Sequence, residues 1–376
     1  MSSLSILVVI LSGVNMSALM EKLRKNSTIK ESDILSKSKF FTETNEVATR
    51  VPALNVALSG SLTGGLKRGL TIVAGPSRHF KSLFSLIMAE AYMKKHEDAI
   101  CLFYDSEFGT PTTYFESAGI DPGRVMHCPI TDMEQLKFDL MQQMAQINRG
   151  DKVVIVIDSI GNLASKKEVD DAMEGKSVAD MTRAKQLKSL FRMVTPHLTI
   201  KDIPMIAINH IYMEMGLYPK AILGGGQGPM LAADNVWIVG RSQEKDGTEL
   251  LGYNFNINIE KSRWVREKTK VSITVKFDGG ISKWSGLLDM AMEAGAVVKP
   301  SNGWYSRVNL ETGEIEEKKF RMKDTDSAEF WMPVLKSKGF NTWVENNYQV
   351  TTSTLINEDL EEDQDNSSEG EGYLHV

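Results

Sequence analysis

The sequence predicts an α/β protein with a mostly parallel, twisted sheet, antiparallel strands at one edge, and a small C-terminal α/β domain. Short continuous apolar runs, typical of parallel strands buried on both faces, alternate with helical stretches of crossover length. Two later segments alternate strictly between apolar and polar residues, which indicates half-buried antiparallel strands. With 376 residues, 42% of them hydrophobic, the chain is long enough for such a domain and a smaller unit.

The N-terminal region is expected to lie outside the main domain. Residues 1–16 should be disordered or an over-extended start, because Met16 opens a more ordinary beginning. The apolar run 6–11 is far shorter than the ~18 residues of a membrane span, and no Lys or Arg precedes it as in a signal peptide. Residues 17–50 form an arm with too few apolar residues to fold alone. The arm should pack on its own domain or on a neighbouring subunit.

The expected core spans residues 51–280, where the strand and helix patterns alternate as in successive βαβ units. A smaller unit, residues 281–350, follows Gly279-Gly280 and contains one predicted helix, 287–294, with several aromatic residues. The predicted parallel strands are 70–75, 99–105, 153–158, 205–209 and 236–239, the crossover helices include 82–95 and 133–148, and the alternating strands are 253–259 and 271–277.

Charge is distributed unevenly along the chain. There are 43 Lys and Arg against 49 Asp and Glu, but eight of the acidic residues lie between Glu358 and Glu371. Without them the balance is 43 to 41, so the body is nearly neutral and a polyanionic partner is not excluded. The tail, residues 351–376, lacks the apolar residues of a core and should be disordered. It is expected to compete electrostatically with DNA for basic surface.

A phosphate-binding loop is predicted between the first core strand and its helix. The strand runs into Gly75-Pro76-Ser77-Arg78-His79-Phe80-Lys81-Ser82, and an apolar helix follows at once. In such a loop backbone N–H groups surround the phosphates, Lys81 reaches the β and γ oxygens, and Ser82 binds Mg²⁺. The match is imperfect because Phe80 replaces the second glycine of the motif, where backbone freedom is normally needed. A chance strand–turn–helix with a lysine at its mouth is the alternative.

Carboxylates are expected at the ends of two further strands. Val153–Asp158 is an apolar run that ends in Asp, which places a carboxylate where it can hold the Mg²⁺ shell. Cys101–Glu107 ends in carboxylates at the same edge of the sheet, where open α/β sheets bind ligands. Glu107 can orient or deprotonate the water that attacks the γ-phosphate. Taken singly, each carboxylate is equally explained as a strand-end cap, but with Lys81 they predict a nucleotide site.

Together these residues resemble RecA-type recombinases and, within them, the UvsX recombinases of T-even-like bacteriophages. The likeness covers most of residues 50–310, and the Phe in the phosphate loop is itself a feature of the phage group. The resemblance implies a RecA-type P-loop ATPase core with ATP and Mg²⁺ as cofactors. The segments that carry it are Pro52–Gly60, Gly75–Ser82, Asp105–Glu107, Asp158-Ser159, Ala207–His210, Gly224–Gly226, Glu260–Arg263 and Asn302–Ser306.

The resemblance assigns roles to residues of the nucleotide site. The loop Gly75–Ser82 binds the phosphates, Asp158 holds the metal shell with Ser82, and Glu107 is the catalytic carboxylate. Tyr114 stands where the family stacks an aromatic ring on adenine, with a core tyrosine on a helix face as the alternative. The sequence leaves open what His79, inside the loop, contributes.

Three further residues are similar to family positions that respond to the γ-phosphate. His210 ends a strand where RecA has a glutamine that senses the γ-phosphate, and a structural histidine is the alternative. Lys261 and Arg263 match a basic pair that reaches across the subunit interface to the neighbour's ATP, like an arginine finger. Residues two apart on a strand share one face, which suits such a pair. A solvated basic strand end is the other interpretation.

Two Gly-rich and polar segments occupy the positions of the DNA-binding loops of RecA. The first runs from about Asp170 to Ala179, with Arg183 on the helix behind it, and the second from Ile211 to Gly228. Glycine-rich backbone can approach phosphates closely, and apolar side chains can wedge or stack against bases. Without the resemblance both would be described as mobile surface loops. The residues expected to contact DNA are Arg183, Met213, Lys220, Gly224, Gly225 and Gly226, with Met215 and Tyr218 as further candidates.

The implied function is that of an ATP-dependent DNA recombinase that hydrolyses ATP. It would polymerise on single-stranded DNA as a helical homo-oligomer and pair that strand with homologous duplex DNA, with a single-strand-binding protein and a loading mediator as further partners. A ring-forming RecA-fold helicase or translocase, and a non-catalytic ATP-binding filament or mediator, remain open. No membrane partner is expected, and the lone cysteines Cys101 and Cys128 suit a reducing cytoplasm, that of the host if the protein is phage-encoded.

Overall fold

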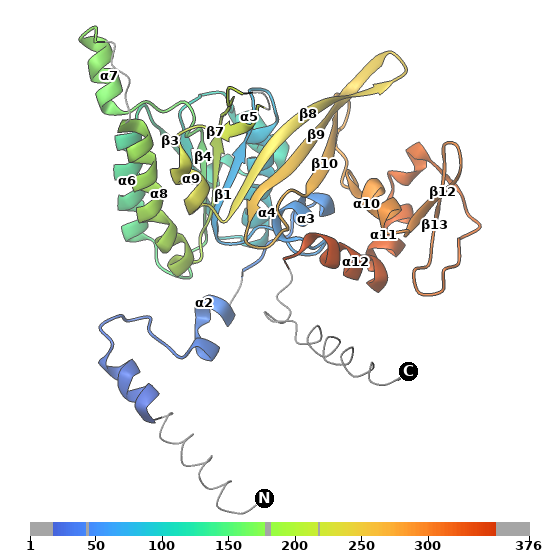
Figure 1. The fold of residues 1–376 in the computed structure, drawn as a ribbon, viewed down its shortest axis with the longest axis horizontal. Coiled ribbons are helices and arrows are strands. Elements are labelled where there is room, and N and C mark those ends of the chain that lie inside the picture. Colours follow the sequence, from blue (N-terminus) through green and yellow to red (C-terminus); the bar gives the residue numbers. More distant parts are fainter. Residues whose placement is uncertain (1–17, 43–44, 177–181, 217–218, 351–376) are drawn as a thin grey trace, which may run out of the picture.

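The computed structural model describes residues 18–42, 45–176, 182–216 and 219–350, so the predicted terminal segments 1–16 and 351–376 lie outside the described residues. The described core is a nine-stranded sheet in the order β11-β10-β9-β8-β1-β5-β4-β2-β3 (Figure 1). Its strands are β1 (Gly69–Ala74), β2 (Ile100–Asp105), β3 (Val125–Pro129), β4 (Val153–Asp158), β5 (Pro204–Asn209), β8 (Asn235–Asp246), β9 (Glu249–Ser262), β10 (Lys270–Lys276) and β11 (Gly280–Ile281).

The sheet has the predicted parallel body and antiparallel edge. β1 pairs in parallel with β5 and β8, and β4 pairs in parallel with β5 and β2. β9 and β10 continue the sheet as antiparallel strands. Every residue of β1, β4 and β5 is buried, because helices cover both faces, and such strands appear in the sequence as continuous apolar runs. The predicted fold class is confirmed.

The sequence analysis did not predict two parts of this sheet. β3 pairs with β2 at one edge, and its residues are only partly covered, so it lacks the apolar run of a buried strand. β8 and β9 form a long hairpin that extends past the four residues of β8 paired with β1 (Figure 1). The far part of this hairpin, residues 240–250, carries mostly polar or exposed side chains and so shows neither an apolar run nor a strict alternation.

The helices pack on the sheet in two layers with separate apolar cores. One core contains the buried residues of α3 and α4, and the other those of α6 and α8. Successive β1 residues alternate between them, since Val73 lies in the first core and Ile72 in the second. The helices and short strands outside the main sheet are α3 (Pro52–Ser59), α4 (Lys81–Lys95), α5 (Thr112–Ala118), η2 (Pro122–Arg124), α6 (Met133–Gln146), α7 (Lys166–Met173), α8 (Thr182–Lys201), β6 (Ile211–Met213), β7 (Ala221–Leu223) and α9 (Gln227–Ala232).

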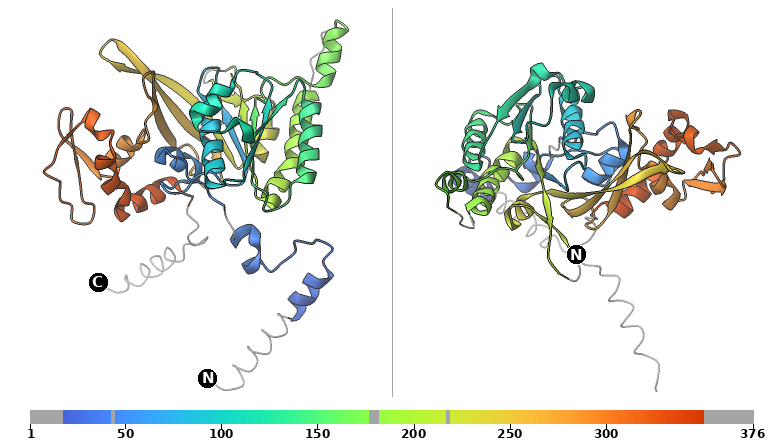
Figure 2. Two further views of the ribbon diagram at one scale, coloured as in Figure 1. Left: turned by 180° about the vertical axis from the view of Figure 1, so that it is seen from behind. Right: turned by 90° about the horizontal axis from the view of Figure 1, so that it is seen from above.

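A small domain lies at the antiparallel end of the sheet, on the side away from α6 and α8 (Figures 1 and 2). Its three-stranded sheet is antiparallel and packs with three helices. The predicted helix 287–294 is present as α10. The elements are α10 (Leu287–Glu293), β12 (Val297–Ser301), β13 (Trp304–Arg307), β14 (Phe320–Arg321), η3 (Met322–Thr325), α11 (Ala328–Lys336) and α12 (Lys338–Tyr348).

Residues 18–42 of the N-terminal arm stand apart from the body in Figure 1 and in the left view of Figure 2, whereas Val47 is buried in the core of the main domain. Residues 18–26 are helical, followed by η1 (Leu35–Lys37) and α2 (Lys39–Thr42). Several large apolar side chains of residues 18–42 are exposed, with Leu23 at 60% and Phe41 at 69%. The arm touches the body near its end, where Arg149 donates a hydrogen bond to the Lys39 carbonyl. Within the described ranges, no helix is both long and apolar enough to cross a membrane.

Candidate nucleotide site and DNA-facing segments

The predicted phosphate loop joins β1 to α4, and Gly75 and Phe80 shape its backbone. A Cβ on Gly75 would lie 2.8 Å from the Val239 carbonyl oxygen, so this position requires glycine. Phe80, the residue before α4, has φ 62° and ψ 14°, the left-handed conformation that glycine normally supplies here. The loop therefore has the backbone that the motif demands, although the sequence departs from the motif at Phe80.

Lys81 opens α4 and its ammonium group is buried in the mouth of the loop. Its Nζ donates a hydrogen bond of 2.8 Å to the Pro76 carbonyl, which holds the side chain across the loop. Burial lowers the pKa of Lys81, and the nearby carboxylates of Glu107 and Asp158 act against that shift. A phosphate group entering the loop would replace a weak carbonyl partner by an anionic one, which favours the charged lysine.

His79 contributes to the shape of the same loop. Its Nδ1 lies 2.9 Å from the Ser77 carbonyl oxygen, so one ring nitrogen is engaged within the loop itself. Burial is the main cause that lowers the pKa of His79; the contact with the Ser77 carbonyl acts against this shift, and the positive charges of Arg241 and Lys81 add to it. A neutral ring that braces the loop is therefore favoured over a cationic phosphate ligand.

Asp158 ends β4 beside Ser82, as the resemblance implied. The carboxyl group is 3% exposed and its Oδ1 has no hydrogen-bond partner among the described residues. Burial raises the pKa of Asp158 to about 6, although a hydrogen bond with Ser82 acts in the opposite direction. A buried carboxylate oxygen without a partner, next to a serine hydroxyl, fits Mg²⁺, which prefers oxygen ligands.

We expect Asp158→Asn to stabilise the nucleotide-free protein by roughly 1–3 kcal/mol, because the amide carries no buried charge. In the wild-type protein the buried charge of Asp158 destabilises the fold fully above about pH 6, the pKa of this group in the folded state. This destabilisation is lost as the pH falls toward the lower pKa that Asp158 has in the unfolded chain. The stabilising effect should therefore shrink between about pH 7 and about pH 4 in Mg²⁺-free thermal unfolding. The exposed Asp98→Asn is the control, and an effect of equal size at both pH values would contradict the assignment.

Glu107 follows β2 and is held by two side chains that come directly after β4 and β5. Ser159 Oγ donates to Glu107 Oε1 at 2.6 Å, and His210 Nε2 lies 3.1 Å from the same oxygen. The hydrogen bond with His210 is the main cause that lowers the pKa of Glu107, and Ser159 and the charge on Lys81 add to it. Glu107 is therefore a carboxylate at neutral pH, and Oε2 is the oxygen left to face a water molecule.

The structure also shows residues of this site that the sequence analysis missed. Ser159 is fully buried, and its backbone N–H donates to Ser106 Oγ. Asp105 accepts hydrogen bonds from the backbone N–H groups of Glu107 and Phe108, which fixes the turn that carries the catalytic candidate. Gly161 lets the His210 ring approach, since a Cβ there would lie 2.4 Å from it. The polar run Asp-Ser after an apolar strand was the available signal for Ser159.

The two remaining nucleotide candidates differ from simple structural residues. Tyr114 on α5 is 44% exposed, whereas its neighbour Phe115 is 6% exposed and fills the core. The interpretation of Tyr114 as a core tyrosine is therefore wrong. His210 lies at the candidate catalytic carboxylate, with Nε2 3.1 Å from Glu107 Oε1, and its role as a γ-phosphate sensor stays a prediction.

Lys261 and Arg263 occupy different environments, unlike a pair on one regular strand. Lys261 Nζ donates to the carbonyls of Met230 and Leu231 on α9, at 2.9 and 3.0 Å. Arg263 lies just past the end of β9, and its Nε is 2.5 Å from a carboxylate oxygen of Asp234. The Arg263 side chain is 65% exposed, so its ion pair is open to exchange with another anion. The register shift in β8 and β9 beside Lys261 breaks the simple alternation.

The first DNA segment differs from the predicted loop. Residues 166–173 form helix α7, which projects from the body (Figure 1), and residues 177–179 of the predicted loop lie outside the described residues. Arg183 is on α8 as expected, but its guanidinium group donates to the carbonyls of Ile160, Gly161 and Leu163. These bonds direct Arg183 toward the strand-end turn after β4. The charge of Arg183 therefore braces this turn, which the sequence could not show.

The second DNA segment is a short hairpin and not an irregular loop. β6 and β7 pair in antiparallel fashion, and α9 follows the three glycines. Met213 is 57% and Met215 99% exposed, Lys220 is also exposed, and Tyr218 lies outside the described residues. Gly225 and Gly226 have φ 87° and 77°, which only glycine adopts readily. The Gly224 N–H donates to the His210 carbonyl at 2.9 Å, so the hairpin is tied directly to the nucleotide site.

Comparison with known proteins identifies the family. A family model described as RecA N-terminal domain matches residues 16–282, and one described as Bacteriophage T4, Recombination and repair protein, C-terminal domain matches residues 284–344. The "Recombination and repair protein" of Enterobacteria phage T4 is 54% identical over 339 residues, 89% of this chain and 87% of that protein. "Protein RecA" of Methylobacterium radiotolerans is 27% identical over 290 residues, 75% of this chain and 76% of that protein. The chain therefore belongs to the RecA family, in the group that carries the C-terminal domain of the phage T4 recombination and repair protein.

Proposed function

We propose that this protein is an ATP-dependent DNA recombinase that polymerises on single-stranded DNA and catalyses homologous pairing and strand exchange. The observation that carries the proposal is the meeting of Lys81, Asp158 and Glu107 at the carboxyl ends of β1, β4 and β2, on one edge of the sheet of a RecA-family chain. Similarity to the phage T4 recombination and repair protein supports this function over a ring-forming helicase or a non-catalytic mediator.

In the proposed mechanism ATP binds with its phosphates in the loop Gly75–Ser82. Mg²⁺ held by Ser82 and Asp158 would neutralise charge on the phosphate oxygens. Lys81 exchanges the Pro76 carbonyl for the β and γ oxygens. Glu107 orients the attacking water through Oε2 and accepts its proton, because Oε1 is occupied by Ser159 and His210. Tyr114 would stack on the adenine.

The contact between His210 and the glycine segment offers a route from nucleotide to DNA. A γ-phosphate is a competing anion for His210, so its arrival would loosen the bond between His210 and Glu107. Any shift of His210 reaches the hairpin through its carbonyl, which accepts from Gly224, and through Asn209, which donates to the Gly224 carbonyl. We propose that Met213, Lys220 and the three glycines contact DNA on this hairpin.

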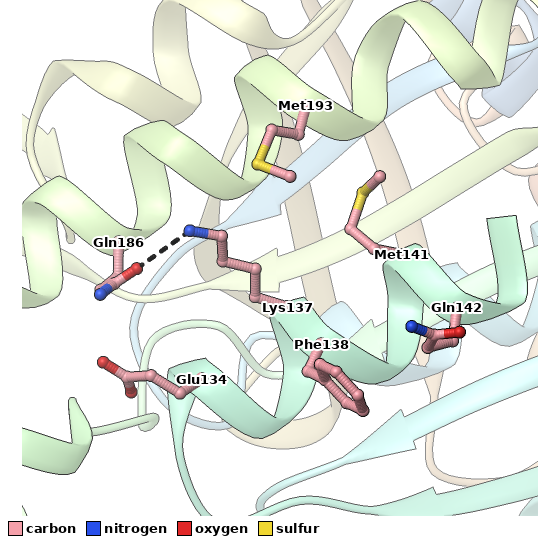
Figure 3. A pocket seen from close by; sticks show the side chains of 7 residues that line it. All are labelled: Glu134, Lys137, Phe138, Met141, Gln142, Gln186 and Met193. Carbon is pink, nitrogen blue, oxygen red and sulfur yellow. Dashed lines mark hydrogen bonds between the residues drawn. The ribbon is translucent and has the colours of Figure 1, made fainter. Parts of the chain in front are cut away.

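The arm is proposed to join subunits of the filament. A groove of about 290 Å³ lies between α6 and α8 and is lined by apolar and neutral side chains beside Glu134 and Lys137 (Figure 3). Phe138 at this groove is 70% exposed, and the arm of the same chain lies elsewhere with its own apolar residues exposed. The apolar arm of a neighbouring subunit is the occupant that would cover both surfaces. Its helix also carries Lys and Arg that can face Glu134.

We expect Phe138→Glu to weaken subunit association by roughly 10-fold or more, because it places a charge in the proposed contact. The readout is light scattering of filaments on single-stranded DNA across protein concentrations. Ile315→Glu is the matched control, since Ile315 is 57% exposed on the C-terminal domain. If both variants assemble like the wild type, the groove is not the arm's docking site.

The experiment that tests the proposed function is the rate of ATP hydrolysis with and without single-stranded DNA over a salt series. DNA should stimulate hydrolysis most at low salt, where phosphate contacts are strongest. Electron microscopy of the same samples should show open helical filaments, whereas closed six-subunit rings would favour the helicase. Absence of stimulation at low salt would exclude a DNA-dependent ATPase. A single-strand-binding protein and a loading mediator are proposed as further partners.

A further inference from the structure

The phosphate loop contains two non-glycine residues in the left-handed conformation. Arg78 has φ 61° and Phe80 has φ 62°. Each such residue costs about 1–2 kcal/mol relative to the right-handed conformation, which would depopulate this backbone in an isolated loop. Some contact outside the loop must therefore hold it.

Side chains from the antiparallel edge of the sheet make these contacts. The Phe80 ring packs against Phe255 of β9 with centroids 5.1 Å apart, and against Phe84 of α4 at 5.5 Å. Arg241 of β8 donates from Nη1 to the Arg78 carbonyl at 3.2 Å. The same guanidinium lies 4.4 Å from the centroid of the Tyr253 ring, which fixes its orientation. Each left-handed residue thus has its own partner on the β8–β9 hairpin.

We propose that Phe255 and Arg241 are positioning residues that hold the phosphate loop ready for nucleotide, in place of the glycine that the motif lacks. The contact with Phe255 stabilises Phe80 only in the backbone conformation that points its side chain at β9. The same conformation fixes the backbone that leads into Lys81. The inference rests on the proposed function, because it assumes that the loop binds a nucleoside triphosphate. It also explains why an aromatic residue is tolerated at position 80.

Two substitutions at position 80 separate the cost of the left-handed backbone conformation from the contribution of the aromatic ring. Phe80→Ala keeps the cost of the left-handed conformation but loses the ring, whereas Phe80→Gly removes the cost. We expect Phe80→Gly to bind a non-hydrolysable ATP analogue with Mg²⁺ about 5- to 30-fold more tightly than Phe80→Ala, the equivalent of ~1–2 kcal/mol. Equal Kd values for the two variants would overturn the inference.

A double-mutant cycle tests the role of Phe255. Phe255→Leu should raise the Kd about 2- to 10-fold when residue 80 is Phe, the value of one aromatic pair. In the Phe80→Gly background the same change should alter the Kd by less than about 2-fold, because no ring remains to be held. Arg241→Ala and Arg78→Gly form a second double-mutant cycle, measured by the same Kd. Both residues are exposed, so these substitutions leave the apolar core intact.

The outcomes distinguish this inference from the proposed function. A wild-type protein that does not bind the analogue overturns both. Wild-type binding with equal losses from Phe255→Leu in the two backgrounds overturns the positioning role alone, since Phe255 then supports only the fold. If thermal unfolding shows that Phe255→Leu is not folded, the Arg241 cycle decides by the same criterion. Coupling of the Kd values in either cycle supports the inference.

Discussion

Glu107→Gln is expected to lower DNA-stimulated ATP hydrolysis by roughly 10²–10⁴-fold, because the amide cannot accept the proton of the attacking water. The change is nearly isosteric, so the hydrogen bond from Ser159 to Oε1 can be kept. Binding of the ATP analogue and assembly on DNA should persist. The measurement is steady-state phosphate release together with equilibrium nucleotide binding.

The control for this variant is Glu116→Gln, an exposed position on the nearby helix α5. Because hydrogen bonds and Lys81 hold the pKa of Glu107 below its usual range, we expect protonation of Glu107 to cost activity only well below neutral pH. Intact turnover in Glu107→Gln would remove Glu107 from the mechanism.

Mixing two inactive variants should restore ATP hydrolysis if Arg263 acts on the neighbour's nucleotide. Lys81→Ala removes the phosphate lysine and Arg263→Ala removes the proposed cation in trans, which is worth about 10³–10⁵-fold in related phosphoryl-transfer sites. In a mixed filament, the intact loop of one variant can meet the intact arginine of the other. With equal amounts, about a quarter of the interfaces should be competent. The readout is the DNA-stimulated rate as a function of the mixing ratio.

Lys81→Ala mixed with Glu107→Gln is the matched control, because both lesions lie on the loop side of the interface and no competent pair can form. The ion pair with Asp234 must open for Arg263 to reach a neighbour, and its exposure makes that exchange inexpensive. If the Lys81 and Arg263 variants do not complement, Arg263 serves its own subunit. Its contact with Asp234 would then be its whole role.

Much of the fold and part of the site could be predicted because they depend on local patterns. A strand buried on both faces must be apolar along its length, so β1, β4 and β5 were recognisable. Parallel strands bring their carboxyl ends to one edge, which is why Asp158 and Glu107 could be expected beside Lys81. β3 and the far part of the β8–β9 hairpin are partly exposed and polar, so no local pattern marked them.

The structure of the two predicted DNA-binding segments could not be predicted from local sequence patterns. Glycines and polar residues predicted loops, but residues 166–173 are helical and residues 211–213 pair with residues 221–223 as antiparallel strands. Arg183 was assigned to DNA from its place in the chain, yet its guanidinium group braces the turn after β4. A charged side chain has the same sequence signature whether its partner is a phosphate or a backbone carbonyl. Only the fold distinguishes the two.

The sequence by itself determined the class of the fold, the position of the phosphate loop and the carboxylates at its edge, because these follow from periodicity and strand order. The tertiary structure decided how the site works in detail. It brings Ser159 and His210 to one oxygen of Glu107, and it places Phe255 against Phe80. These partners are separated by tens to more than a hundred positions along the chain. Their contacts depend on how the strands are ordered and staggered in the sheet, which no short window of sequence contains.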